Sequence, residues 1–198
     1  MLETLRERIE GPLRSRLEPV VAWLAARQVT PNQVTLAALA VSALAAVLIA
    51  FGWLRLGALV LIVASLGDLV DGMLARSTDQ ASPFGAFFDS TLDRLGEGAV
   101  LAAVAYHFAV ADRPLLVALV VLALLGSLLV SYTRARAEAL GVDCKVGLMS
   151  RAERLVLVIA GLLLGLLGPA IAAMAVLSLY TVGERMALVR DALENREP

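Results

Sequence analysis

Apolar runs of about 20 residues recur along this chain, and they constrain its fold more than any other feature. Hydrophobic residues make up 60% of the sequence, and the mean hydropathy is +0.82. A run of that length crosses the hydrocarbon core of a membrane as one α-helix. We therefore expect an all-α integral membrane protein, and a chain of 198 residues leaves no room for a separate soluble catalytic domain.

Six membrane spans are predicted, separated by residues that favour turns or helix starts. They cover residues 33–52, 56–77, 84–110, 114–139, 151–167 and 169–190. The first span follows a clear helix start, because Thr30 can cap the helix, Pro31 suits its first position and Gln33 completes a capping box. We expect the spans together to form one six-helix transmembrane domain over residues 30–198, which would hold any catalytic site.

Residues 1–29 are expected to form an amphipathic helix at the membrane interface. Charged side chains interrupt every apolar run there, so the segment does not have the pattern of a signal peptide. Gly11-Pro12 is expected to separate an earlier turn from the main helix. The apolar face recurs at steps of three and four residues and consists of Leu13, Leu17, Val20, Val21 and Leu24. The alternative is a soluble cap that packs on the bundle.

Basic residues are distributed unevenly between the two sides of the predicted bundle. The N-terminus, the 77–84 turn, the 140–150 loop, the C-terminus and the adjoining helix ends carry 15 of the 17 Lys and Arg residues. Only Arg55 and Arg113 fall on the other side. By the positive-inside rule we expect a multi-pass protein of the cytoplasmic membrane with both termini in the cytoplasm. The net charge of -1 argues against a nucleic-acid partner.

Four aspartates interrupt the second and third predicted spans near their cytoplasmic ends: Asp68, Asp71, Asp89 and Asp93. Within each pair the spacing is three or four residues, which places both carboxylates on one face of a helix. A short turn joins the two helices as antiparallel neighbours, so we expect all four carboxylates at one depth. Carboxylates in a membrane are costly unless a strong counter-charge compensates them.

Bound metal ions are the simplest such counter-charge. Oxygen-only ligands favour hard cations over zinc, Mg²⁺ or Mn²⁺ first and Ca²⁺ as an alternative. Four carboxylates suit two ions about 4 Å apart, an arrangement that serves phosphoryl transfer. Gly72 and Gly85 would let a ligand approach the backbone, and Arg76 suits a phosphate. The alternative is a set of structural ion pairs with Arg76 and Arg94. Two arginines do not balance four carboxylates, however, and Glu97 increases the deficit.

The spacing of these residues resembles the motif of the CDP-alcohol phosphotransferase (phosphatidyltransferase) family. Eight fixed residues match over 26 positions: Asp68, Asp71, Gly72, Ala75, Arg76, Gly85, Asp89 and Asp93. The resemblance implies six transmembrane helices, a cytoplasmic active site and a homodimer. It also implies a reaction in which the hydroxyl of an acceptor attacks the β-phosphorus of a CDP-linked lipid and CMP leaves.

The resemblance also implies roles for individual residues. One divalent cation would be held by Asp68, Asp71 and Asp89, and the second by Asp68, Asp89 and Asp93. Asp93 would in addition act as the general base. The CDP-lipid would be bound by Pro31, Asn32, Gln33, Val34, Gly72, Ala75, Arg76, Ser82 and Gly85. For the helix start at 31–34, capping alone is a sufficient explanation.

A second group of basic residues gathers near the cytoplasmic ends of the fourth and fifth spans: Arg134, Arg136, Lys145, Arg151 and Arg154. It could form an anion pocket for an acceptor that carries phosphate, or it could reflect topology and attraction to anionic lipid. Segments 132–138 and 147–154 resemble the inositol-phosphate branch of the family, the phosphatidylinositol-phosphate and archaetidylinositol-phosphate synthases. In that branch, the resemblance implies that the phosphate of the acceptor is bound by Arg134, Arg154 and Arg185.

The favoured hypothesis is an enzyme that transfers the phosphatidyl group from CDP-diacylglycerol to inositol phosphate, giving phosphatidylinositol phosphate and CMP. The same chemistry with glycerol 3-phosphate, that of a phosphatidylglycerophosphate synthase, is the alternative, because this acceptor also carries phosphate. A divalent-cation transporter is the hypothesis from another class. It should place polar residues in both membrane halves, whereas the last three spans are apolar away from their cytoplasmic ends.

Overall fold

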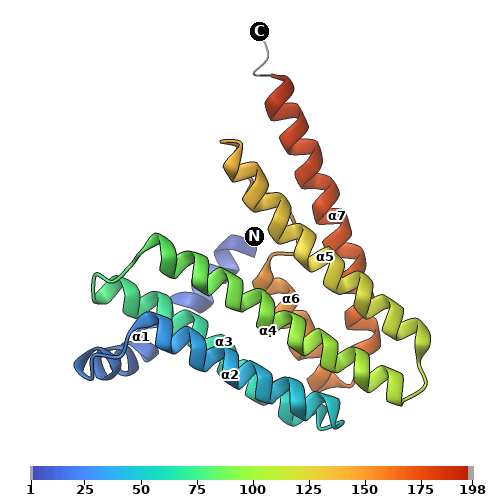
Figure 1. Ribbon diagram of the computed structural model, residues 1–198, viewed down its shortest axis with the longest axis horizontal. Coiled ribbons are helices and arrows are strands. Elements are labelled where there is room, and N and C mark those ends of the chain that lie inside the picture. The colour runs from blue at the N-terminus through green and yellow to red at the C-terminus, as the bar shows by residue number, and fades with distance from the viewer. Residues whose placement is uncertain (1, 196–198) are drawn as a thin grey trace. The chain divides into compact units, whose positions relative to one another are not determined.

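The computed structural model describes residues 2–195, with the side chains of residues 11–195, and this part of the chain is built from helices (Figure 1). The helices are α1 (Leu2–Ala26), α2 (Pro31–Ala50), α3 (Leu54–Ser77), α4 (Pro83–Val110), α5 (Pro114–Ala139), α6 (Arg151–Leu164) and α7 (Leu167–Glu194). The all-α prediction is confirmed. The bounds of α2 to α7 agree with the six predicted spans to within a few residues.

Within the described residues, four helices are long and apolar enough to cross a membrane: α2, α3, α5 and α7. Helix α4 has 28 residues, but charged residues such as Asp89, Asp93 and Arg94 occupy its first half, and Glu97 follows soon after. Helix α6 has 14 residues and is about 21 Å long, which is less than a hydrocarbon core of about 30 Å. Four of the six predicted spans are therefore supported by length and composition.

The chain divides into two compact units, and α2, α3 and α4 each contribute a part to both. The first unit holds the residues up to 43 and residues 60–96, and the second holds residues 44–59 and those from 97 onward. All four aspartates of the motif fall in the first unit. The three arginines expected to bind the acceptor fall in the second.

In the first unit, the apolar face of α1 packs against α3 and α2. Val21 is buried with Val70 and Leu74, and the partly buried residues around them are Leu17, Leu24, Ala25, Val34 and Met73. Part of the apolar face predicted for this segment is therefore buried against α2 and α3. The expected break at Gly11-Pro12 is wrong, because α1 continues through Pro12 and Pro19. A proline removes one helical hydrogen bond, but that loss does not end a helix held by packing further along.

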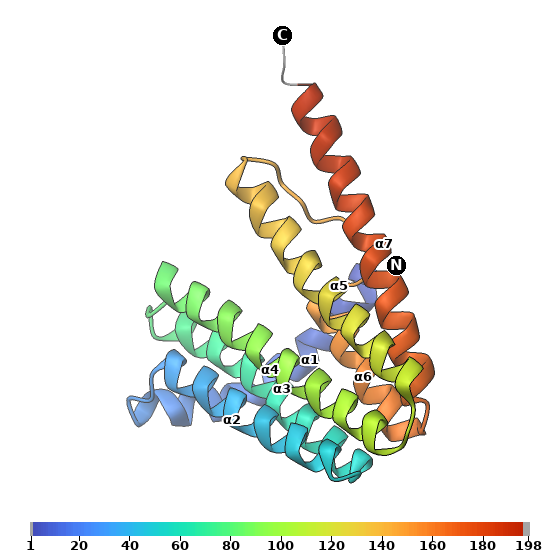
Figure 2. The same cartoon turned by 45° about the vertical axis from the view of Figure 1, so that its right-hand side comes forward.

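In the second unit, α5 and α7 lie side by side, as Figures 1 and 2 both show. Small residues allow this close approach: a Cβ added at Gly126 would lie 2.8 Å from the Cβ of Ser178. Helix α6 also packs against α7, where a Cβ at Gly161 would lie 2.6 Å from the Cβ of Ala170. Replacing either glycine would force the helices apart.

The loop between α5 and α6 is fixed against α7. Val142 and Cys144 are buried together with Ala137 of α5, and apolar residues near the end of α7 pack around them. Gly147 has a φ of +118°, and a Cβ there would lie 2.2 Å from Cγ2 of Thr181. The backbone N–H of Met149 donates to Oγ1 of Thr181 at 3.2 Å. The loop is thus a structured part of the second unit.

Candidate active site

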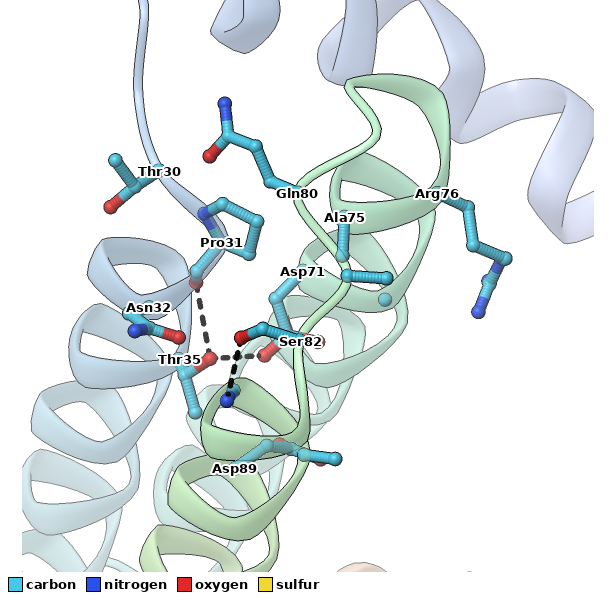
Figure 3. A pocket seen from close by; sticks show the side chains of 14 residues that line it. Thr30, Pro31, Asn32, Thr35, Asp71, Ala75, Arg76, Gln80, Ser82 and Asp89 are labelled. Carbon is cyan, nitrogen blue, oxygen red and sulfur yellow. Dashed lines mark hydrogen bonds between the residues drawn. The ribbon is translucent and has the colours of Figure 1, made fainter.

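A cavity of about 420 Å³ lies in the first unit, where α2 and α4 begin and α3 ends. Figure 3 shows the side chains around it. They come from the start of α2, the last turns of α3, the connecting turn and the first turns of α4. The lining residues are Thr30, Pro31, Asn32, Thr35, Asp71, Gly72, Ala75, Arg76, Gln80, Ala81, Ser82, Gly85, Ala86 and Asp89.

Two capped helix N-termini border the cavity. At the start of α2, Gln33 N–H donates to Oγ1 of Thr30 at 3.4 Å and Thr30 N–H donates to Oε1 of Gln33 at 2.9 Å, so the predicted capping box is confirmed. At the start of α4, Gly85 N–H donates to Oγ of Ser82 at 3.0 Å. The N-terminal ends of helices carry partial positive charge, and this end of the unit therefore favours an anion such as a pyrophosphate.

Two glycines, Gly72 and Gly85, stand in the walls of the cavity. A Cβ added at Gly85 would lie 3.1 Å from Oγ of Ser82 and 3.6 Å from Oδ1 of Asn32. At Gly72 it would lie 3.5 Å from Nη1 of Arg76, whose side chain folds back along α3. A side chain at Gly85 would therefore crowd Ser82 and approach Asn32, whereas a Cβ at Gly72 would make ordinary van der Waals contact with Arg76.

Asp71 and Asp89 bring negative charge to the same cavity. The Asp71 side chain is buried, and its Oδ2 accepts a hydrogen bond from Oγ1 of Thr35 at 2.7 Å. Asp71 is also close enough to Asp89 and to Asp68 to interact with both electrostatically. Asp68 and Asp93 are partly buried on α3 and α4 and do not line the cavity. The structure therefore brings the two halves of the acidic motif together across α3 and α4.

The donor set of this site fits a hard divalent cation, because its charged ligands are all carboxylate oxygens. Other polar residues of the lining, such as Asn32 and Ser82, offer a neutral amide or hydroxyl oxygen to a cation, and the described lining contains no thiol or imidazole. Among the side chains that the structure describes, no three from histidine, cysteine, aspartate and glutamate stand close enough together to enclose an ion as they are placed.

Seven of the nine residues expected to bind the CDP-lipid line the cavity: Pro31, Asn32, Gly72, Ala75, Arg76, Ser82 and Gly85. The other two have structural contacts instead. The side chain of Gln33 caps α2, and Val34 packs against the apolar cluster between α1 and α3.

The sequence interpretation missed five lining residues as site residues: Thr30, Thr35, Gln80, Ala81 and Ala86. Thr35 had a detectable signal, because it is a polar residue four positions after Pro31 in an apolar helix, and a polar group at such a position points to function. Gln80 and Ala81 lie in a turn, where periodicity gives no guidance.

The three arginines expected to bind the acceptor are all engaged with partners in the second unit. Arg154 is 1% exposed, and its guanidinium makes two hydrogen bonds to Glu97 and one to the carbonyl of Met149. Arg185 is buried and donates to the carbonyls of Val146 and Val130. Glu97 therefore pairs with Arg154, and the expectation that it adds uncompensated charge to the acidic motif is wrong.

Arg134 differs from the other two because it is accessible. Its side chain is half exposed, and Nε donates to Oε1 of Glu138 one turn further along α5, at 2.8 Å. Lys145, another member of the basic group, is paired with Asp143 in the exposed loop, and the hydrogen bond and charge of Asp143 raise the pKa of Lys145. Surface pairs of this kind contribute little to stability and exchange partners easily.

Sequence comparisons agree with the residues of this site. The sequence model of the CDP-alcohol phosphatidyltransferase family matches residues 28–182. The archaetidylinositol phosphate synthase of Methanothermobacter thermautotrophicus is 35% identical, over 97% of each chain. The phosphatidylinositol phosphate synthase of Mycolicibacterium smegmatis is 38% identical, over 85% of this chain and 81% of its own.

A solved structure with the same fold is that of the Mycobacterium tuberculosis phosphatidylinositol phosphate synthase. With CDP-DAG bound it aligns with a TM-score of 0.81 at 33% identity, covering 86% of this chain and 92% of that one. The same enzyme in complex with manganese and citrate also aligns with a TM-score of 0.81. The family model matches most of the chain, and six of the eight fixed residues of the motif line one cavity, so this protein belongs to the CDP-alcohol phosphatidyltransferase family.

Proposed function

We propose that this protein transfers the phosphatidyl group from CDP-diacylglycerol to the hydroxyl of inositol phosphate, giving phosphatidylinositol phosphate and CMP. The observation that carries the proposal is the cavity in which residues of the nucleotide motif meet Asp71 and Asp89 between two helix N-termini. The relatives support the choice of acceptor, because those reported above are phosphatidylinositol or archaetidylinositol phosphate synthases. A related structure contains CDP-DAG.

Two divalent cations, Mg²⁺ or Mn²⁺, belong to this proposal. Their ligands would be Asp68, Asp71, Asp89 and Asp93, whose carboxylate oxygens suit hard cations. When bound, the ions neutralise the pyrophosphate of the CDP-lipid and stabilise the charge that develops on the leaving CMP. The manganese in the related mycobacterial structure supports this assignment.

The remaining chemistry falls to the residues of the chain. Pro31, Asn32, Gly72, Ser82 and Gly85 would hold the CDP moiety in the cavity, and Arg76 would supply a guanidinium to its phosphates. Asp93 would accept the proton of the acceptor hydroxyl as that oxygen forms a bond to the β-phosphorus. The bond from the β-phosphorus to the bridging oxygen of the pyrophosphate breaks, and CMP leaves with both electrons of that bond.

For the phosphate of the acceptor, the proposal retains Arg134, Arg154 and Arg185 but gives them different roles. Arg134 can turn to a phosphate by leaving a surface pair with Glu138, which costs about 0.3–0.5 kcal/mol. Arg154 and Arg185 are buried and already donate to Glu97 and to backbone carbonyls, so a phosphate would have to compete with these partners. We therefore assign the first contact to Arg134.

We further propose that α4 and α6 complete a bundle of six transmembrane helices, residues 30–198, with α1 at the membrane interface. Val20 and Trp23 of α1 are about half exposed, and the guanidinium of Arg27 lies 3.8 Å from the ring centre of Trp23, an arrangement suited to the headgroup region. The distribution of basic residues supports a cytoplasmic orientation of the termini and the active site. A homodimer is the expected assembly.

The direct test is CMP release from CDP-diacylglycerol by the purified full-length protein in nanodiscs. Inositol phosphate, glycerol 3-phosphate, unphosphorylated inositol and no acceptor are compared, each with Mg²⁺. We expect release that depends on inositol phosphate. Preferred use of glycerol 3-phosphate would support the alternative acceptor, and absence of release with every acceptor would contradict the proposed function.

A further inference from the structure

Thr35 stands where the proposed nucleotide site meets the proposed metal site. It is 4% exposed, lies in the second turn of α2 and contributes to the wall of the cavity. Its Oγ1 is 3.1 Å from the carbonyl oxygen of Pro31 and 2.7 Å from Oδ2 of Asp71 (Figure 3). Thr35 therefore links the helix start that borders the nucleotide cavity to a carboxylate of the acidic motif.

The contact with Asp71 is the stronger of the two. Both acceptors are oxygens, and a hydroxyl has one hydrogen to share between them. A carboxylate acceptor makes a shorter and stronger bond than a neutral carbonyl, which agrees with the two distances. Asp71 is also 5% exposed, so little water can replace this donor. The hydroxyl thus fixes one oxygen of the carboxylate.

The register of α2 against α3 makes this contact possible. A Cβ added at Gly67 would lie 2.8 Å from the Cβ of Ala38, so the two helices approach closely at that level. Thr35 is three residues before Ala38, and Asp71 is four residues after Gly67, which puts both one turn along the same interface of antiparallel helices. The close approach brings the short threonine side chain within reach of the carboxylate.

We infer that Thr35 is a positioning residue for the metal site: its hydroxyl holds Oδ2 of Asp71 and leaves Oδ1 directed toward a divalent cation. This inference rests on the proposed function, because Asp71 must be a metal ligand for its orientation to matter. Outer-shell partners of ligating carboxylates commonly affect metal affinity by about 10- to 100-fold. Thr35 is outside the set of residues that the family motif contains.

The test measures Mn²⁺ binding to the full-length protein without substrate, by electron paramagnetic resonance, beside steady-state kinetics. Thr35→Val keeps the shape of the side chain and removes the donor. We expect it to weaken Mn²⁺ binding about 10- to 100-fold and to lower kcat, with a smaller effect on the KM for inositol phosphate. Thr35→Ser keeps the hydroxyl and should restore most of the affinity.

Thr78→Val is the matched control. Thr78 is partly buried in the first unit, and its hydroxyl donates to the carbonyl of Leu74, four residues earlier, which is the spacing between Thr35 and Pro31. This variant should bind Mn²⁺ as the wild type does. If Thr35→Val lowered the melting temperature but left the Mn²⁺ affinity unchanged, as in the control, Thr35 would be a structural residue and the inference would be overturned.

A double variant separates the inference from the proposed function. In an Asp71→Asn background, Thr35→Val should cause no further loss of Mn²⁺ affinity, because the carboxylate on which it acts is gone. An additional loss of the full size would show that Thr35 acts by another route and would overturn the inference. Should the wild-type protein bind no Mn²⁺, the metal assignment itself would fail, and the inference with it.

Discussion

Arg154 and Glu97 form a buried ion pair with two parallel hydrogen bonds, from Nε to Oε1 at 2.7 Å and from Nη2 to Oε2 at 3.0 Å. The side chain of Arg154 is 1% exposed and that of Glu97 is 17% exposed. Nη1 of Arg154 also donates to the carbonyl of Met149 at 3.0 Å, which connects the α5–α6 loop to α4 and α6. An arginine expected to bind substrate thus has a structural role within the second unit.

The first prediction concerns the stability of this pair. Removing one partner leaves a buried charge uncompensated, at a cost of about 3–5 kcal/mol, whereas removing both is less costly. Glu97→Gln and Arg154→Gln should each lower the melting temperature of the protein in detergent, and the double variant should lose less than the sum of the two. Strictly additive losses would contradict a direct pair.

The second prediction concerns Arg134 and the phosphate of the acceptor. Arg134→Ala should weaken the apparent affinity for inositol phosphate by about 1.5–3 kcal/mol, because a charge-assisted hydrogen bond is lost. The KM for CDP-diacylglycerol and the melting temperature should change little, since the pair with Glu138 is at the surface. Acceptor titrations at saturating CDP-diacylglycerol measure the effect.

Arg190→Ala is a suitable control for Arg134→Ala. Arg190 is an exposed arginine of the second unit, paired with Asp191 and Glu194 on α7. Both variants lose one basic residue, so an effect of net charge or of anionic lipid should appear in both. Unchanged acceptor affinity in Arg134→Ala, or equal loss in the two variants, would reduce the basic group to a role in topology.

The third prediction separates the aspartates by function. Asp68→Asn should abolish both Mn²⁺ binding and transfer, because Asp68 is expected to hold both ions. Asp93→Asn should lower turnover strongly but reduce CDP-lipid binding less than Asp68→Asn does, because one ion would keep all of its ligands. Equal loss of CDP-lipid binding in the two purified, folded variants would argue that Asp93 is mainly a metal ligand.

The helices and most of the cavity could be predicted from local sequence signals. Apolar runs and the capping box at Thr30 and Gln33 located α2, and residues spaced by three or four positions placed Asp68 with Asp71 and Asp89 with Asp93. These features depend on neighbours within one helix or across one short turn. The nucleotide motif added Gly72, Arg76, Ser82 and Gly85 through the family resemblance.

The contacts that could not be predicted join residues far apart in sequence. Arg154 and Glu97 are separated by 57 positions, and their pairing depends on how α4 and α6 pack. In sequence, Glu97 belongs with the nearby aspartates and Arg154 with the nearby arginines. Thr35 reaches Asp71 across 36 positions only because Gly67 and Ala38 set the distance between two helices. Helix periodicity gives the faces of helices and does not give their register.

The last prediction tests that register. Gly67→Ala would place a Cβ 2.8 Å from the Cβ of Ala38, which neither side chain can relieve by rotating, so α2 and α3 must separate. Overpacking of this kind typically costs about 1–3 kcal/mol. The separation should also lengthen the hydrogen bond from Thr35 to Asp71. We therefore expect a lower melting temperature together with weaker Mn²⁺ binding.

Gly98→Ala is the control for this variant. Gly98 also lies inside a helix, α4, and a Cβ there would meet no atom within 4 Å outside its own helix backbone. Because alanine is favoured over glycine in a helix by about 1 kcal/mol, Gly98→Ala should be neutral or stabilising and should leave Mn²⁺ binding unchanged. Melting curves and Mn²⁺ titrations of both variants decide the matter. If Gly67→Ala matched Gly98→Ala in both measurements, the close approach of α2 and α3 would not control the orientation of Asp71.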